Sequence, residues 1–127
     1  MTGQKDSKGW TDKSDSGPES ESFVCDATEV AEGRYLVCSV AGTSILVCRS
    51  AGALSAIENR CSHQGMALAG GRLIGERIIC PEHGAAFDVR TGKALSFPAV
   101  FPIRLFPLIE RDGRVMISMH KPLGSIA

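Results

Sequence analysis

The chain has 127 residues and a mass of 13.5 kDa, which is the size of a single domain. Its 14 basic and 14 acidic residues cancel, and this balance disfavours a nucleic-acid binder, since such proteins usually carry a basic excess. No apolar run approaches the roughly 20 residues that span a bilayer. The first twenty residues are polar and do not resemble a secretory signal. We therefore expect a cytoplasmic protein that contacts neither membrane nor nucleic acid.

The N-terminal segment differs in composition from the rest of the chain. Residues 1–22 are rich in Ser, Asp, Lys and Gly, with three Lys against five acidic residues. Such a segment buries too little apolar surface to offset its ordering entropy, so a disordered charged arm is predicted. We expect one folded domain over residues 23–120 and a short C-terminal tail over residues 121–127.

Short apolar runs alternate with Gly-containing turns from Phe23 onward, and no stretch of ten residues shows a helical period. This pattern predicts an all-β domain of many short antiparallel strands. Arg111-Asp112-Gly113 is the strongest hairpin signal. Pro107 interrupts an apolar run, so we expect it at a sheet edge or a bulge. The predicted strands cover residues 34–40, 44–49, 54–58, 73–74, 77–79, 86–89, 103–110 and 114–119.

Cysteine and histidine residues indicate a metal site. The cysteines number five, which is odd, so they cannot all form disulfides within the chain, and a cytosolic chain keeps its thiols reduced. Two similar segments, Cys61-Ser62-His63 and Cys80-Pro81-Glu82-His83, are separated by sixteen residues. If the first donor of each segment binds one iron and the second donor binds the other, a Cys₂ iron and a His₂ iron bridged by sulfide result. A tetrahedral Cys₂His₂ zinc site is the alternative, although zinc sites typically pair like donors.

The full pattern is C-x-H, sixteen residues, then C-P-x-H-G-x-x-F-D-x-x-T-G-x-A. Over about residues 23–119 it resembles Rieske proteins, and most of all the small Rieske ferredoxins of bacterial ring-hydroxylating oxygenase systems. The resemblance implies stacked antiparallel sheets with two cluster-binding loops at one tip and one [2Fe–2S] cluster. It further implies that Cys61 and Cys80 hold the inner iron, that His63 and His83 hold the outer iron, and that no residue is catalytic.

The departures from respiratory, high-potential Rieske proteins predict a low reduction potential. Those proteins have an additional Cys in each loop, and the two cysteines form a disulfide. This chain has Met66 and Glu82 at these positions, so that disulfide cannot form here. Their Ser and Tyr hydroxyls, which hydrogen-bond the cluster sulfurs, correspond to Ala85 and Phe87. Loss of these donors and the anion of Glu82 both disfavour the reduced cluster, so we expect a potential at the low end of the Rieske range, about −150 mV.

The resemblance implies a one-electron carrier that is not itself an enzyme. It would take electrons from an NAD(P)H-dependent flavin reductase and pass them to a terminal ring-hydroxylating oxygenase of aromatic catabolism. Both partners would dock briefly at the cluster tip, on a rim formed by Gln64, Gly65, Met66, Pro81 and Gly84. The alternative is the small Rieske-type subunit of an NAD(P)H-dependent nitrite reductase. An oxygenase catalytic subunit is excluded because the chain is too short and has too few histidines.

The remaining candidate residues are expected to be structural. Cys25, Cys38 and Cys48 lie in strand runs, where free Cys commonly packs as a small hydrophobic side chain. We expect His120 to be solvated in the tail and Trp10 to lie in the arm without a defined role.

Overall fold

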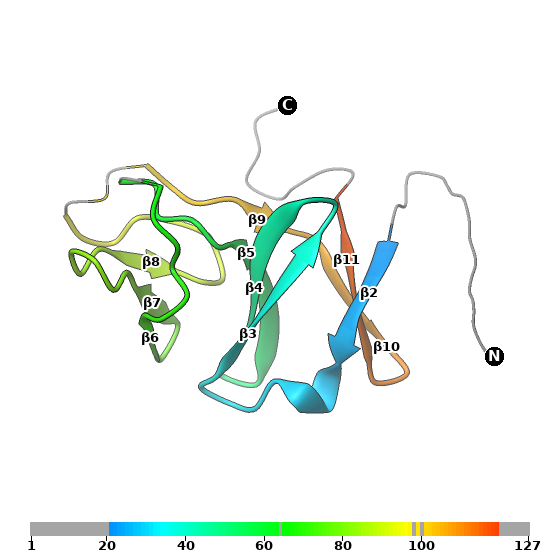
Figure 1. The fold of residues 1–127 in the computed structure, drawn as a ribbon. Coiled ribbons are helices and arrows are strands. Elements are labelled where there is room, and N and C mark those ends of the chain that lie inside the picture. The colour runs from blue at the N-terminus through cyan, green and yellow to red at the C-terminus, as the bar shows by residue number, and fades with distance from the viewer. Residues whose placement is uncertain (1–20, 64, 98, 100, 120–127) are drawn as a thin grey trace.

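The structure is a computed structural model that describes residues 21–63, 65–97, 99 and 101–119 (Figure 1). Within these ranges every strand pairing is antiparallel and the helical content is one 3₁₀ turn, which confirms the all-β prediction. No helix of this part of the chain is long and apolar enough to cross a membrane. The predicted tail of residues 121–127, together with His120, Trp10 and Gln64, lies outside the described residues.

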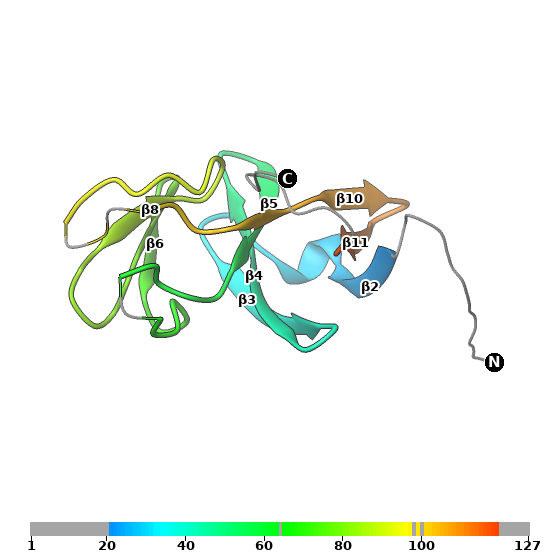
Figure 2. The ribbon, with the colours of Figure 1, turned by 90° about the horizontal axis from the view of Figure 1, so that it is seen from above.

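Three small sheets follow one another along the molecule, as the two views in Figures 1 and 2 show. The central sheet has the order β3-β4-β5-β9, a second sheet has the order β10-β11-β2, and a third has the order β6-β7-β8. The elements are β2 (Glu21–Asp26), a 3₁₀ turn (Ala27–Glu29), β3 (Tyr35–Val40), β4 (Thr43–Ser50), β5 (Ala53–Glu58), β6 (Arg72–Ile74), β7 (Arg77–Ile79), β8 (Ala86–Asp88), β9 (Leu105–Phe106), β10 (Leu108–Arg111) and β11 (Arg114–Ser118).

Two details differ from the prediction. Strand β2 begins at Glu21, so Glu21 and Ser22, the last residues of the predicted arm, pair with β11. The predicted strand over residues 103–110 is two strands, of which β9 pairs with β5 and β10 pairs with β11. Pro107 lies between them, where its missing N–H breaks no ladder, and it marks a change of sheet rather than a bulge within one strand.

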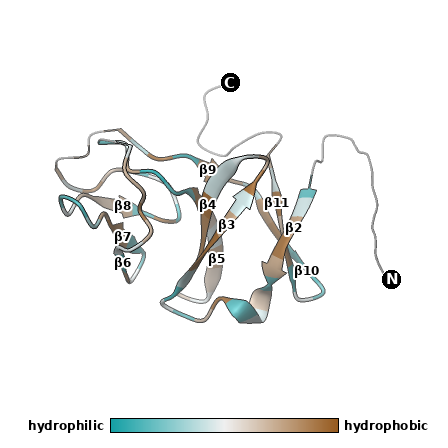
Figure 3. Cartoon of the chain, viewed as in Figure 1, coloured by the Kyte–Doolittle hydropathy of each residue, from teal (hydrophilic) through white to brown (hydrophobic). Residues whose placement is uncertain are grey.

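Strand β4 separates two apolar cores. Its residues alternate, with Leu46 and Cys48 in the core shared with β6–β8, and Ile45 and Val47 in the core shared with β2 and β11. Successive side chains of a strand point to opposite faces, so a strand buried on both faces is apolar at every position. Figure 3 shows this hydrophobic concentration in the central strands and the hydrophilic residues in the outer turns.

Three two-residue hairpin turns have positive φ at both positions, which is the type I′ geometry. Ala41 occupies the first position of the β3–β4 turn with φ of 52°, a conformation that alanine adopts at a cost. Asparagine adopts it more readily, so Ala41→Asn is expected to raise the free energy of unfolding by about 0.5–1 kcal/mol. Urea denaturation measures this change, and Ala31→Asn, at an exposed position without positive φ, is the control. An unchanged or lower midpoint for Ala41→Asn would contradict the prediction.

The three cysteines outside the two segments lie on strands, as predicted: Cys25 on β2, Cys38 on β3 and Cys48 on β4. Burial raises the pKa of the Cys48 thiol from 9.0 to about 12. Between these values the unfolded chain has lost the proton and the folded chain retains it. The free energy of unfolding therefore falls as the pH rises through this window, by up to about 1.4 kcal/mol per pH unit.

Cys48→Ala is therefore expected to lose less stability than the parent protein between pH 8 and pH 11, although its stability at pH 7 is lower. Urea denaturation of both proteins at each pH gives the two slopes. Equal slopes would show that Cys48 does not control the alkaline limb.

Candidate metal centre

The two Cys-containing loops share one backbone hydrogen-bond pattern. In loop 1 (residues 59–71), the Cys61 N–H donates to the Met66 carbonyl at 2.7 Å, and the Gly65 N–H donates to the Cys61 carbonyl at 2.8 Å. In loop 2 (residues 80–85), the same pair of bonds returns. The Cys80 N–H donates to the Ala85 carbonyl at 2.7 Å, and the Gly84 N–H donates to the Cys80 carbonyl at 3.1 Å.

Glycine is required at the fourth residue after each Cys, because the chain turns back there with positive φ. The φ angles are 74° at Gly65 and 76° at Gly84. The histidine, by contrast, takes a different place in each loop: His63 is two residues after its Cys and His83 is three residues after its Cys. The backbone of the two loops is therefore matched, while the imidazoles leave it at different points.

The structure brings the two imidazoles close together at the surface, while the two thiols are buried. The ring centroids of His63 and His83 are 5.5 Å apart, with the ring planes at 89°. Both histidines are exposed, whereas Cys61 and Cys80 are only 2% and 3% exposed and belong to the same apolar core. One end of the molecule thus presents imidazole donors at the surface and thiol donors below it.

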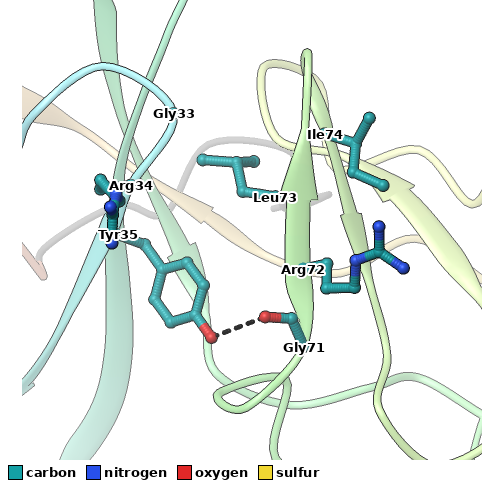
Figure 4. Close-up of a pocket in the computed structure, with 7 residues that line it drawn as sticks. All are labelled: Gly33, Arg34, Tyr35, Gly71, Arg72, Leu73 and Ile74. Atoms are coloured by element: carbon teal, nitrogen blue, oxygen red, sulfur yellow. Dashed lines mark hydrogen bonds between the residues drawn. The ribbon is translucent and has the colours of Figure 1, made fainter.

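Two side chains, that of Asn59 directly after β5 and that of Tyr35 on β3, hold the segment of residues 68–71 of loop 1, here called the strap. The Asn59 Oδ1 atom accepts hydrogen bonds from the Leu68 and Ala69 N–H groups, both at 2.8 Å. The Tyr35 hydroxyl accepts from the Gly70 N–H at 2.8 Å and donates to the Gly71 carbonyl at 2.9 Å, the bond drawn in Figure 4. Tyr35 lines a groove of about 470 Å³ between β3 and β6.

A third loop, residues 89–104, carries exposed aromatic side chains to the same end. The Ser62 Oγ donates to the Phe101 carbonyl at 2.5 Å, which ties this loop to the residue next to His63. The Ser96 Oγ accepts from the Ala86 N–H at 3.1 Å, next to the end of loop 2. Phe97 and Phe101 are 84% and 70% exposed. Sequence patterns did not indicate them, since each precedes a proline in an apolar stretch, which is equally typical of a buried loop.

The donor set fits a dinuclear iron–sulfur cluster. Two thiols and two imidazoles are provided by two loops of matched backbone, and each iron of a Rieske cluster takes only two protein ligands. Within the described residues, no three His, Cys, Asp or Glu side chains gather around one point as ligands of a single ion.

Comparison with known proteins agrees with this geometry. The family model described as the Rieske [2Fe-2S] domain matches residues 20–107. The chain belongs to the Rieske family. The Rieske cofactor is accordingly one [2Fe–2S] cluster, as predicted.

Several relatives of this Rieske chain are ferredoxin components of dioxygenase systems. It is 39% identical to the biphenyl 2,3-dioxygenase ferredoxin component of Rhodococcus jostii, over 76% of this chain and 91% of that one. It is 33% identical to the 3-phenylpropionate/cinnamic acid dioxygenase ferredoxin subunit of Photorhabdus laumondii, over 80% and 97% of the two chains. Among solved structures, a complex of reduced oxygenase and oxidised ferredoxin in carbazole 1,9a-dioxygenase matches with a TM-score of 0.74 and 31% identity, over 77% of this chain and 92% of that one. These matches confirm the predicted fold.

Proposed function

We propose that this Rieske protein is the one-electron carrier of an aromatic-ring-hydroxylating oxygenase system. Cys61 and Cys80 are proposed to hold one iron, and His63 and His83 the other. The observation that supports the proposal is the matched pair of loops, each with a buried Cys followed by an exposed His, and the 5.5 Å between the two imidazole centroids. The [2Fe–2S] cluster supplies a reversible one-electron couple when bound.

The protein side chains give this end of the molecule its properties. The buried thiols lie in an apolar core, which keeps water away from the thiolate ligands. The exposed imidazoles of His63 and His83 form the point where electrons enter and leave. Ala85 and Phe87 offer no side-chain hydroxyl, and Glu82 adds an exposed anion on loop 2. We therefore propose a potential near the low end of the Rieske range, about −150 mV.

The partners are proposed to be a terminal oxygenase and an NAD(P)H-dependent flavin reductase, both in the cytoplasm. Support for the oxygenase comes from the similar ferredoxin whose solved structure is a complex with an oxygenase. Neither partner is bound permanently, because redox partners typically meet through small interfaces. The chain performs no bond chemistry on an organic substrate and is not an enzyme by itself.

Phe97 and Phe101 are expected to be the apolar centre of the docking surface. Replacing both by serine removes apolar area that a partner would cover, and about tenfold weaker docking is expected. The measurement is the ferredoxin concentration that gives half-maximal oxygenase turnover, with the reduction potential determined in parallel. Phe23→Ser, at a 46% exposed position on β2 away from the loops, is the matched control. Equal effects of the control and the double variant would contradict this assignment.

The visible spectrum and the iron content of the purified protein test the proposed function. We expect a red-brown protein with iron and sulfide in equal amounts, which bleaches with dithionite and then gives a Rieske-type EPR signal of low average g. A colourless protein with stoichiometric zinc, even after anaerobic preparation, would overturn the proposal.

A further inference from the structure

The charges of this chain are divided between its two ends, although the whole sequence has a formal net charge of zero. The cluster lobe, residues 59–104, has six basic against three acidic residues and a net charge of +3. The base, residues 21–58 and 105–119, has four basic against seven acidic residues and a net charge of −3. The lobe and the base lie at opposite ends of the molecule in Figure 1. The molecule is therefore an electric dipole whose positive end carries loops 1 and 2.

Three arginines lie at these loops, two of them beside loop 1 and one beside loop 2. Arg60 and Arg104 line a groove of about 500 Å³ together with Gly65 of loop 1. Arg72 lines a second groove, of about 390 Å³, together with Cys80 and other residues of loop 2. We call Arg60, Arg72 and Arg104 the basic collar.

Little negative charge opposes the collar. Among the ion pairs of the described residues, none includes Arg60 or Arg72, and Arg104 approaches Glu58 only at 4.0 Å. The described part of the lobe has one other ion pair, between Arg90 and Glu76 at 2.7 Å, in which the two charges cancel. Glu82 is the single acidic residue of loops 1 and 2. Arg60 and Arg72 are therefore available to carboxylates of another molecule, whereas the Arg104 guanidinium also lies over the Phe106 ring, 5.0 Å from its centroid.

Given the proposed function, we propose that the basic collar docks an acidic face of the terminal oxygenase. A guanidinium group binds carboxylates through two parallel hydrogen bonds and is weakly hydrated, which suits a contact that forms and breaks quickly. The dipole turns the loops toward a negative surface before contact, and such steering raises association rates by about 10- to 1000-fold. The exposed Phe97 and Phe101 then supply the apolar centre, and the collar supplies the charged rim.

Small redox ions test the local charge without the natural partner. The protein is reduced with dithionite, freed of excess reductant and mixed with hexacyanoferrate(III), a trianion; one electron passes to this ion, whose Fe(III) becomes Fe(II). As the salt concentration rises from 10 to 200 mM, the second-order rate constant is expected to fall about fivefold, because salt screens the attraction. With hexaammineruthenium(III), a trication, the rate constant is expected to rise. A rate constant with the trianion that stays constant or rises with salt would overturn the proposal. The reacting end would then carry no net positive charge, like the protein as a whole.

Charge variants locate the effect. The double variant with Arg60→Gln and Arg72→Gln is expected to lose most of the salt dependence with hexacyanoferrate. Arg111→Gln is the matched control, since Arg111 is exposed and lies on β10 of the base, 3.4 Å from Glu21. A second measurement is independent of electron transfer: at pH 7 and low salt, a sulfonate resin is expected to retain the parent protein and Arg111→Gln longer than the double variant. Equal behaviour of the double variant and the control in both measurements would overturn the assignment to the collar.

A purified terminal ring-hydroxylating oxygenase and an NAD(P)H-dependent flavin reductase allow a final comparison. Electron transfer to the oxygenase is expected to slow with salt and to slow at least about threefold in the double variant at low salt. An oxygenase reaction insensitive to both changes would overturn the docking proposal, including the case in which only the reductase reaction is sensitive. These failures are distinct from failure of the proposed function, since a protein without a reducible cluster would show no electron transfer to either ion.

Discussion

Replacing Cys80 by alanine is expected to give a folded but colourless protein with cluster occupancy lowered by more than about tenfold. The thiol is 3% exposed and small, so its removal leaves only a small cavity in the core. Its proposed role as a ligand has no substitute, because an alanine methyl group cannot bind iron. Visible absorbance and iron per chain measure the occupancy, and circular dichroism shows whether the sheets remain.

Cys48→Ala is the matched control for this experiment. Cys48 is 0% exposed and lies in the same apolar core as Cys80, so both variants lose the same atom from the same environment. The control is expected to retain its colour and full iron content. A coloured Cys80→Ala protein, or equal iron loss in both variants, would refute the ligand assignment.

Gly71→Ala is expected to have the largest effect on stability, lowering the free energy of unfolding by about 3 kcal/mol or more. A Cβ atom at this position would lie 1.9 Å from the Ile79 carbonyl oxygen and 3.0 Å from the Leu68 carbonyl oxygen. Both obstacles are backbone atoms, so no side chain can move aside. Relief would require β6 and β7 to separate, since Arg72 and Ile79 are partners in their register.

Urea denaturation compares Gly71→Ala with Gly75→Ala. Gly75 has a positive φ of 61°, but no atom lies within 4 Å of its added Cβ. The control therefore has only the backbone cost of a left-handed alanine, about 1–2 kcal/mol. If Gly71→Ala were no less stable than Gly75→Ala, the close approach of the strap to β7 would be refuted.

Local sequence signals account for most of the strands. The pair β3–β4 was predicted within one residue at each end, and the reversal between β10 and β11 was predicted too, because a two-residue turn ending in glycine fixes where each hairpin reverses. The start of β10 was not predicted, since the expected strand ran from residue 103 through Pro107. The bounds of strand β2 were not predicted, although Cys25 was expected in a strand, because only three of its six residues, Phe23, Val24 and Cys25, are apolar. It is ordered by pairing with β11, about ninety residues later, which no local pattern records.

The sequence singles out the proposed donor residues but not their surroundings. The spacing of Cys61, His63, Cys80 and His83 is a property of the sequence, and the structure brings the two histidine rings together. The hydrogen bonds of Tyr35 to the strap join residues 35 and 36 positions apart, so they depend on the final fold. The same holds for the basic collar, which forms only when three separate segments meet at one end.

The matched loops have a consequence for redesign. Their shared hydrogen bonds join backbone atoms only, from the Cys N–H and carbonyl to a glycine N–H and a carbonyl farther along. The shape of each loop is therefore independent of which donor its side chains offer, provided that Gly65 and Gly84 stay in place. Exchanging an imidazole for a thiolate would alter the chemical hardness of the site and leave its scaffold intact. If the four proposed ligands hold the cluster, metal preference and electron affinity can thus be adjusted at these positions without rebuilding the surrounding sheets.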